Sequence, residues 1–419
     1  MSRNYKNWLH GYARYTQNTE SPELFHFWTG VSTIGGALRR QVWIDQLFFE
    51  WTPNFYIVLV GPPGIAAKST SANIGMDLLR RVDAVHFGPK SMTWQGLVVA
   101  LNKATELVPY GKGVDQEFHP MSCITCVVSE LGTFLRPKDK EMVDVLVDLW
   151  DGRKETWQRS LATSDGYEVE NPWINVIGAT TPSWLEENFD ESMIGGGLVS
   201  RIIFVYGDKK RMLIPYPSEL EDRNEFKEMG DKLVEDLNEI ALIKGEYRLT
   251  KEAIEWGSLW YAKHWRSRPA HMASERYSGY IARKQTHMHK LAIVYAAAQR
   301  NELTITKEDL IACNRLIGQL EDSMKVVFDS IGVSETNKWA KEITSFLRTY
   351  GEMPQHKLYR HVMTSMTVKQ FDDTCAGMVK ANTLRVIQRG SDLMYGLKKP
   401  NDEPTEPEDP PPQSQETDG

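Results

Sequence analysis

The sequence has few cysteines and no long hydrophobic segment. Its 419 residues include four cysteines, too few for a disulfide scaffold in a chain of this length. No run approaches the ~18 apolar residues of a membrane span, so we expect no membrane partner. The first residues, MSRNYKNWLHGYARY, lack the apolar core of a secretory signal, and we expect a cytoplasmic location. The composition, 41% hydrophobic and 25% charged, is typical of a globular protein with about two or three domains.

Basic residues are absent from the end of the chain. Residues 401–419 hold seven of the 56 acidic residues, five prolines and no Lys or Arg, so we expect a disordered acidic tail. Without this tail, 49 acidic residues remain against 49 Lys and Arg, and the rest of the chain is neutral. Residues 335–400 hold eleven Lys and Arg against six Asp and Glu, a balance of +5. The charge asymmetry therefore lies at the C-terminal end.

The stretch from Phe55 to Val82 has the order strand, Gly-rich turn, Lys-Ser-Thr and helix. This is the order of a phosphate-binding P-loop, whose backbone N–H groups surround phosphate oxygens at a helix N-terminus. Its lysine reaches the β- and γ-phosphates, and its hydroxyl binds Mg²⁺. We therefore predict ATP and Mg²⁺ as cofactors, with Ser69 as a metal ligand. The expected nucleotide-binding residues are Gly61, Pro62, Pro63, Gly64, Ala67, Lys68, Ser69 and Thr70.

This loop departs from the usual pattern in two ways. Six residues separate Gly61 from Lys68, which is one more than usual, and Ala67 stands where a second glycine is usual. The alternative is an ordinary strand–turn–helix with an unrelated lysine. We predict that the loop binds a nucleotide and that these departures affect the rate of turnover more than binding.

An acid and two further polar residues follow the loop, and each has a chemistry that ATP hydrolysis can use. Glu130 ends the apolar run CITCVV-Ser129-Glu130, where it can polarise the attacking water; we predict Ser129 and Glu130 in the metal shell. Thr180 ends the run INVIGAT and can orient that water. Arg201 precedes the run IIFVYG, a place from which ring ATPases reach the neighbouring γ-phosphate. The alternatives are that Glu130 merely begins a helix and that Arg201 is a surface residue.

These motifs, in this order, resemble the AAA+ ATPases. GGLVSRIIFVYG is similar to the Ser-Arg segment of minichromosome-maintenance-type helicases, and IARKQTHMHKLAIVYAAAQ with ITKEDLIACNRLI resembles their helical lid. Over about residues 20–400 the chain also resembles P-loop proteins of phages and mobile elements, often labelled primase or helicase. The resemblance implies an α/β fold with a P-loop AAA+ core, a parallel sheet, a helical lid and a C-terminal winged helix. It also implies that Arg283 contacts the nucleotide.

We expect five segments along the chain. Apolar runs near residues 55–60, 82–87, 123–128, 173–180 and 202–207 alternate with helical spacing, which predicts a mostly parallel sheet. The segments are a helical lead-in packed on the core (1–50), the ATPase core (51–215), the lid (216–333), the winged helix (334–400) and the tail (401–419).

The family resemblance implies a homo-oligomeric ring, a hexamer, that hydrolyses ATP between subunits and moves along DNA, preferably single-stranded. That function is a replicative-type DNA helicase of a phage or mobile element in the bacterial host cytoplasm. The alternative is a nucleotide-dependent replication initiator or helicase loader, a switch that binds DNA and protein. A third hypothesis is a regulatory scaffold with a degenerate nucleotide site.

Two segments are candidates to contact nucleic acid. Residues 152–170 predict a β-hairpin that turns at Ser164-Asp165-Gly166, with Lys154 and Arg159 placed to touch phosphates and Trp157 to stack on a base. The alternative is a solvated hairpin with a buried tryptophan.

The other segment is the expected winged helix. Its recognition helix would span Val368–Lys380 and include Lys369, and its wing would carry Arg385 and Arg389. Two neighbouring acids on that helix, Asp372 and Asp373, instead favour protein docking. Replication proteins are therefore possible partners, through this segment or the acidic tail.

Overall fold

The computed structural model describes residues 3–110, 117–135, 139–161, 164–189, 193, 197–220, 222–267, 272, 274–331 and 335–398. The chain is a mixed α/β protein that divides into two compact units, Met1–Gly332 and Val333–Gly419. The first unit holds the three segments expected as lead-in, core and lid. The predicted acidic tail, 401–419, lies outside the described residues. Among the described helices, none is long and apolar enough to cross a membrane.

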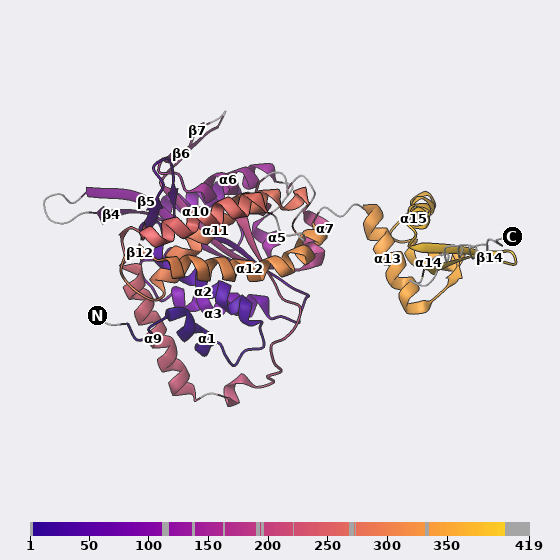
Figure 1. Ribbon diagram of the computed structural model, residues 1–419, viewed down its shortest axis with the longest axis horizontal. Helices are drawn as coiled ribbons and strands as arrows, with labels where there is room; N and C mark the ends of the chain where they lie inside the picture. Colours follow the sequence, from indigo (N-terminus) through magenta and orange to yellow (C-terminus); the bar gives the residue numbers. More distant parts are fainter. Residues whose placement is uncertain are drawn as a thin grey trace, which may run out of the picture. The chain divides into compact units, whose positions relative to one another are not determined.

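A five-stranded sheet forms the centre of the first unit (Figure 1). Its strands, in spatial order, are β4 (Thr105–Tyr110), β5 (Glu117–Val128), β8 (Pro172–Thr180), β3 (Tyr56–Val60) and β9 (Ile202–Tyr206). The last four run parallel, and only β4 is antiparallel to its neighbour. Every residue of β3 and β8 is buried, as expected for parallel strands covered on both faces. The predicted mostly parallel sheet is confirmed.

Two N-terminal helices pack on this sheet and on the helix that follows β3. They are α1 (Trp8–Tyr15) and α2 (Glu23–Leu38), and α2 contacts both β8 and α3 (Lys68–Leu79). The aromatic residues expected at helical spacing, including Trp8, Tyr12, Phe25 and Trp28, are almost fully buried. The lead-in is thus part of the core.

Further elements of the first unit complete its layers. Its other helices are α4 (Trp94–Lys103), α5 (Leu131–Phe134), α6 (Lys140–Asp151), α7 (Pro182–Asn188), α9 (Arg223–Ala241), α10 (Lys251–Arg266), α11 (Ser278–Ala297) and α12 (Lys307–Ser330). Short strands are β1 (Val42–Asp45), β2 (Glu50–Trp51), β10 (Gly245–Glu246), β11 (Arg248–Leu249) and β12 (Thr304–Ile305). Helices α11 and α12 lie side by side, and α12 contacts β9 (Figure 1).

The strand predicted near residues 82–87 is wrong. The segment makes only an isolated parallel bridge, Phe87 to Thr125, beside β5. Gly88 and Pro89 follow at once, and proline cannot extend a ladder because it has no N–H. The edge of the sheet is instead completed by β4, which pairs with the first half of β5.

The hairpin predicted for residues 152–170 is present, but its turn is misplaced. It consists of β6 (Thr156–Leu161) and β7 (Ser164–Glu170), and it projects from the unit (Figure 1). Ser164 and Gly166 already belong to β7, and the register shifts between Arg159 and Leu161. Gly166, at φ +81°, permits this irregularity, so the Asp-Gly signal marks a bulge instead of the turn.

The second unit combines three helices with a three-stranded antiparallel sheet. Its elements are α13 (Glu335–Tyr350), β13 (Met353–Pro354), α14 (Gln355–Val362), α15 (Val368–Lys380), β14 (Leu384–Arg389) and β15 (Asp392–Leu397). Helix α15 has the bounds predicted for a recognition helix. Leu358, Phe371 and Leu384 lie in a separate hydrophobic core.

Candidate functional site

The Gly-rich loop connects strand β3, which lies between β8 and β9, to helix α3 at the carboxyl edge of the sheet. Strand β3 ends at Val60 and α3 begins at Lys68. A Cβ on Gly61 would lie 2.3 Å from the carbonyl oxygen of Gly207, so only glycine fits this close approach. Ala67 adopts the left-handed conformation, with φ 45° and ψ 41°, which strains a residue that carries a Cβ. The loop thus places an alanine at a backbone position that favours glycine.

Lys68 folds back onto this loop. Its Nζ donates to the carbonyl oxygens of Gly61, at 2.7 Å, and Pro62, at 2.9 Å. Partial burial lowers the pKa of its ammonium group from the ordinary lysine value. Two neutral carbonyl oxygens accept from the charged ammonium group of Lys68. A negatively charged phosphate oxygen in their place would form a stronger, charge-assisted hydrogen bond.

The predicted acid lies beside the first turn of α3. The Ser69 hydroxyl donates to the carbonyl oxygen of Ser129 at 3.3 Å, which joins the helix to the end of β5. Ser129 and Glu130 are exposed, and among the described residues no hydrogen bond or ion pair engages the Glu130 carboxylate. Glu130 also precedes the short helix α5, without capping it through its side chain. Hydroxyl and carboxylate oxygens suit Mg²⁺, which is bound by few protein ligands together with substrate phosphates.

The polar tip of β8 lies next to the loop. Val60 pairs with Thr180 across the two strands, and the Gly61 N–H donates to the Thr180 carbonyl at 3.3 Å. The neighbouring hydroxyl of Thr181 instead caps α7 by accepting from the Trp184 N–H at 3.1 Å. The structure therefore brings together the loop, Ser69, Ser129, Glu130 and Thr180, as the carboxyl ends of adjacent parallel strands require.

Arg201 lies at the opposite, amino edge of the same sheet. It directly precedes β9, whose Ile202 pairs with Tyr56 at the start of β3, whereas Tyr206 pairs with Val60 beside the loop. Four residue steps of strand separate the two edges by about 13 Å. Arg201 is thus not brought to the loop of its own chain.

The Arg201 guanidinium is buried and contacts three other residues. It donates to both carboxylate oxygens of Asp151, at 3.0 and 3.2 Å, and to the Gly197 carbonyl at 3.1 Å. It also lies over the Trp150 ring, 5.5 Å from the centroid, and only 7% of its side chain is exposed. The alternative that Arg201 is a surface residue is therefore wrong.

Arg283 lies with Arg201 and not with the loop. A Cβ built on Gly197 would be 2.8 Å from Arg201 Nη1 and 4.0 Å from Arg283 Nη2, so both guanidinium groups flank this residue. Burial, and then the positive charge of Arg201, lower the pKa of Arg283. The two predicted arginines form one group, which we call the arginine pair.

The same face of α11 continues as a buried polar cluster that the sequence analysis missed. His287 Nε2 is bonded to the Ser200 carbonyl at 3.0 Å, and burial lowers its pKa to about 4. Lys290 Nζ donates to Asn54 Oδ1 at 2.7 Å and lies 3.7 Å from the Trp150 ring centroid. Burial lowers the Lys290 pKa well below its ordinary value. The spacing of residues 283, 287 and 290, which places them on one face of a helix, could have predicted this cluster from the sequence.

No family model and no curated protein matches this chain at a significant level. The grouping of residues at the two edges of the sheet is therefore the basis for any functional assignment.

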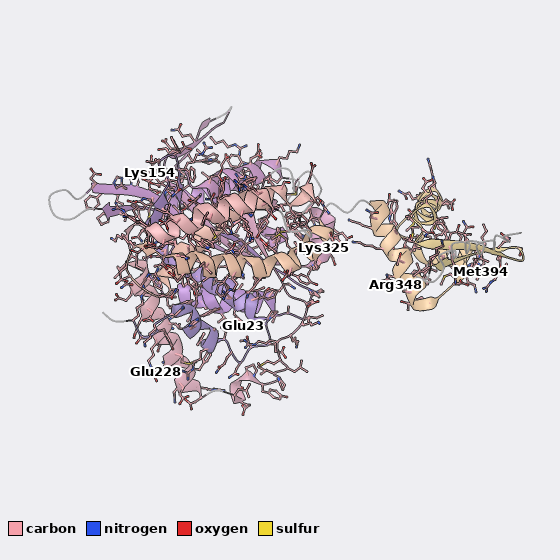
Figure 2. All side chains as sticks on the ribbon, viewed as in Figure 1. Glu23, Lys154, Glu228, Lys325, Arg348 and Met394 are labelled. Carbon is pink, nitrogen blue, oxygen red and sulfur yellow. The ribbon has the colours of Figure 1, made fainter. Side chains whose placement is uncertain are left out.

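The basic residues predicted for the hairpin are partly engaged by their own chain. Arg159 lies 4.4 Å from the Trp94 ring centroid and 3.6 Å from a Glu141 carboxylate oxygen. Lys154, at the base of the hairpin, is 64% exposed and 3.7 Å from a Glu50 oxygen (Figure 2). Trp157 packs against the hydrophobic core, which favours a structural role for that ring.

The basic residues predicted for the second unit divide into two groups. Arg385 and Arg389 both bond to the carboxylate of Glu352. Lys369 and Lys380 are exposed on α15, as are the acids Asp372 and Asp373. Local acids thus offset much of the positive charge expected to meet phosphates.

Proposed function

We propose that this chain is the subunit of an ATP-driven, DNA-translocating ring, a replicative-type helicase with an AAA+ P-loop core. The observation that carries the proposal is the convergence of the loop, Ser69, Glu130 and Thr180 at the ends of three neighbouring parallel strands. A phosphate-binding loop with an acid and a polar group beside it is the arrangement that hydrolysis of a nucleoside triphosphate needs.

The proposed roles follow from position. Lys68 exchanges two loop carbonyls for the β- and γ-phosphates, and the backbone N–H groups of residues 61–67 surround them. Ser69, with Ser129 and Glu130, would hold Mg²⁺, and the metal would neutralise the charge that develops on the phosphates. The Glu130 carboxylate, which has no partner among the described residues, accepts the proton of the attacking water. Thr180 orients that water.

The arginine pair supports a site shared between subunits. Arg201 and Arg283 lie about 13 Å of strand away from their own loop, so they serve a neighbour's nucleotide in the proposal. A head-to-tail contact of this kind closes into a ring when its rotation closes. We propose a hexamer in the cytoplasm, with α10, α11 and α12 as the lid.

The proposed DNA contacts are the β6–β7 hairpin and the second unit, which we propose is a winged helix. The order of three helices followed by a two-stranded wing supports this assignment. The exposed Lys154 at the hairpin favours a backbone contact to single-stranded DNA. The basic balance of residues 335–400 supports a second phosphate contact or the docking of replication proteins.

The second candidate is a replication initiator or helicase loader that switches with nucleotide. Two observations favour it. Ala67 strains the loop, and Ser129 supplies no negative charge to the metal, so slow hydrolysis is expected. The pairing of both wing arginines with Glu352 also weakens the case for tight DNA binding.

Steady-state ATP hydrolysis, with and without single-stranded DNA, tests the proposal on the wild type and on Glu130→Gln. We expect DNA to stimulate the wild type, and Glu130→Gln to bind ATP but lose about 10²- to 10⁴-fold in rate, the usual contribution of a general base. Glu187→Gln, an exposed acid on nearby α7, is the matched control and should change neither.

Two outcomes would contradict the proposal. Hydrolysis that DNA does not stimulate, or bound ATP that is never hydrolysed, would favour the initiator or loader. Normal hydrolysis by Glu130→Gln would show that another group is the base.

A further inference from the structure

The turn between β1 and β2 exposes three consecutive large apolar side chains. Leu47 is 90% exposed, Phe48 93% and Phe49 54%. Single exposed apolar residues are ordinary on protein surfaces, but a contiguous group at the end of a projecting turn marks a contact surface. We call Leu47, Phe48 and Phe49 the apolar tip.

The apolar tip is held in a defined conformation. The Leu47 N–H donates to Asp45 Oδ1 at 2.8 Å, and the Gln46 N–H donates to the Phe49 carbonyl at 2.9 Å. Leu47 has φ +63°, a strained value for a bulky residue. Backbone strain of this kind persists where the surrounding structure imposes it, often at sites of recognition. The turn thus presents Phe48 instead of folding it onto the core.

The tip stands on the edge of the sheet that carries the arginine pair. Strand β2 follows the tip, and the Trp51 ring lies 4.3 Å from that of His289 on α11, the helix of Arg283. Arg40, which donates to Pro172 at the start of β8, lies 4.0 Å from Glu50. These contacts place β2 beside the amino ends of the parallel strands.

A hollow of about 310 Å³ lies near the other edge. It is bounded by α1, the start of α2, and α11 and α12, and Figure 2 labels Glu23 at the start of α2. Ser21, just before α2, donates to the carbonyl of Ala67, so this end of α2 adjoins the nucleotide loop. Apolar lining includes Leu9, Phe27 and Leu316.

We infer that the apolar tip is a contact between subunits, and that the hollow of a second copy of this chain receives Phe48. The inference rests on the proposed ring. One chain carries the projecting element on its amino edge and the receiving hollow near its carboxyl edge, which is the arrangement of a head-to-tail interface. A buried aromatic anchor in such a pocket is the usual energetic centre of an interface.

The same contact completes the proposed catalytic site. A neighbour whose hollow holds the tip turns its carboxyl edge, with its loop, toward the amino edge that bears Arg201 and Arg283. Tip and arginine pair then act on the same partner. Glu23, Arg211 and Arg315 also border the hollow and provide the polar rim that surrounds an apolar interface core.

The first test compares the assembly of Phe48→Ala with that of the wild type by mass photometry, with a non-hydrolysable ATP analogue present. We expect the concentration for half-assembly to rise at least about tenfold, the effect of one interface anchor. Leu259→Ala removes a side chain that is 74% exposed on α10 and is the matched control. Unchanged assembly of Phe48→Ala would overturn the inference.

The second test asks where the tip docks. The four native cysteines are buried, so L47C, in the apolar tip with Phe48 intact, and A312C, in the wall of the hollow, each add one accessible thiol. A short bismaleimide should join the mixture into L47C–A312C dimers and leave each variant alone uncrosslinked. Dimers of L47C alone would show a symmetric contact and overturn the head-to-tail inference.

These tests separate the inference from the proposed function. Crosslinked rings without DNA-stimulated hydrolysis would retain the inference and reject the motor. DNA-stimulated hydrolysis by an assembly whose formation does not depend on Phe48 would retain the motor and reject the inference. A monomer that binds anionic phospholipid vesicles through Phe48 would overturn the inference and identify the tip as a membrane contact.

Discussion

The two edges of the central sheet differ in how their polar groups are held. At the carboxyl edge, the Glu130 carboxylate has no partner among the described residues, and the Lys68 ammonium group is held only by backbone carbonyls. At the amino edge, Arg201 and Lys290 are buried and bound to side chains and to the Trp150 ring. The polar groups of the carboxyl edge are open to a ligand, whereas those of the amino edge already have partners in the chain.

If the chain binds a nucleotide as proposed, this difference indicates which edge must change. Burying cations is costly unless partners satisfy them, so the amino edge keeps its geometry through Asp151 and the aromatic ring. The carboxyl edge instead holds groups whose present partners are weaker than phosphate. In the proposed ring, the preformed arginine edge of one chain meets the open loop edge of the next.

The substitution with the largest expected effect, Arg201→Ala, tests whether the amino edge takes part in hydrolysis. Arginines that stabilise the transition state of phosphoryl transfer contribute about 10³- to 10⁵-fold in rate, so we expect a loss of that order. ATP binding, measured by equilibrium titration, should persist because the residue lies at the opposite edge from the loop. Arg201→Lys keeps a charge but not the two-pronged contact to Asp151, and it should also hydrolyse slowly.

Mixing variants separates a shared site from a damaged fold. An Arg201→Ala subunit keeps its own Glu130, and a Glu130→Gln neighbour supplies an intact Arg201, so some interfaces of a mixed assembly are complete. We expect the mixture to recover part of the hydrolysis that neither variant shows alone. No recovery in an assembled mixture would contradict the shared site.

Sequence pattern predicted the carboxyl edge better than the amino edge. The loop, Ser69, Glu130 and Thr180 are close in space because parallel strands bring their carboxyl ends together, a rule that needs no tertiary detail. The partners of Arg201 come from α6 and α11, and no local pattern specifies that Asp151 and Arg283 meet. The bulge at Gly166 was missed because a turn signal and a bulge signal share the same residue.

Acidification should weaken the folded state, and the amino edge most. Burial lowers the pKa of His26, His287 and His289 from 6.5 to about 4. Between these values the unfolded chain binds protons that the folded chain does not, so stability is full above pH ~6.5 and falls toward pH ~4. Each histidine contributes at most about 1.4 kcal/mol per pH unit in this window.

Denaturant unfolding at several pH values measures this slope. Two of the three histidines, His287 and His289, lie on α11 at the amino edge, so replacing both with glutamine should reduce the slope more than His26→Gln does. The exposed His10 is the control, and His10→Gln should leave the slope unchanged. A flat profile from pH 6.5 to 4 would show that these sites open to water or titrate normally.

The smallest expected effect, Ala67→Gly, tests the open edge itself. Ala67 has a left-handed backbone that costs an L-residue about 1–2 kcal/mol, and glycine removes that cost while adding about 0.4–1 kcal/mol of unfolded-state entropy. We therefore expect a net gain of roughly 0.5–1 kcal/mol in the free energy of unfolding. Glycine also lets the backbone approach phosphate more closely, so ATP should bind more tightly.

Ala66→Gly is the matched control because residue 66 is buried and is not among the positive-φ positions. It removes a core methyl group without relieving strain, so it should destabilise the protein and leave nucleotide affinity unimproved. Equal effects of the two substitutions would mean that the strain at residue 67 does not limit the loop. The departure of this loop from the usual glycine would then be neutral, and slow hydrolysis would have to come from Ser129.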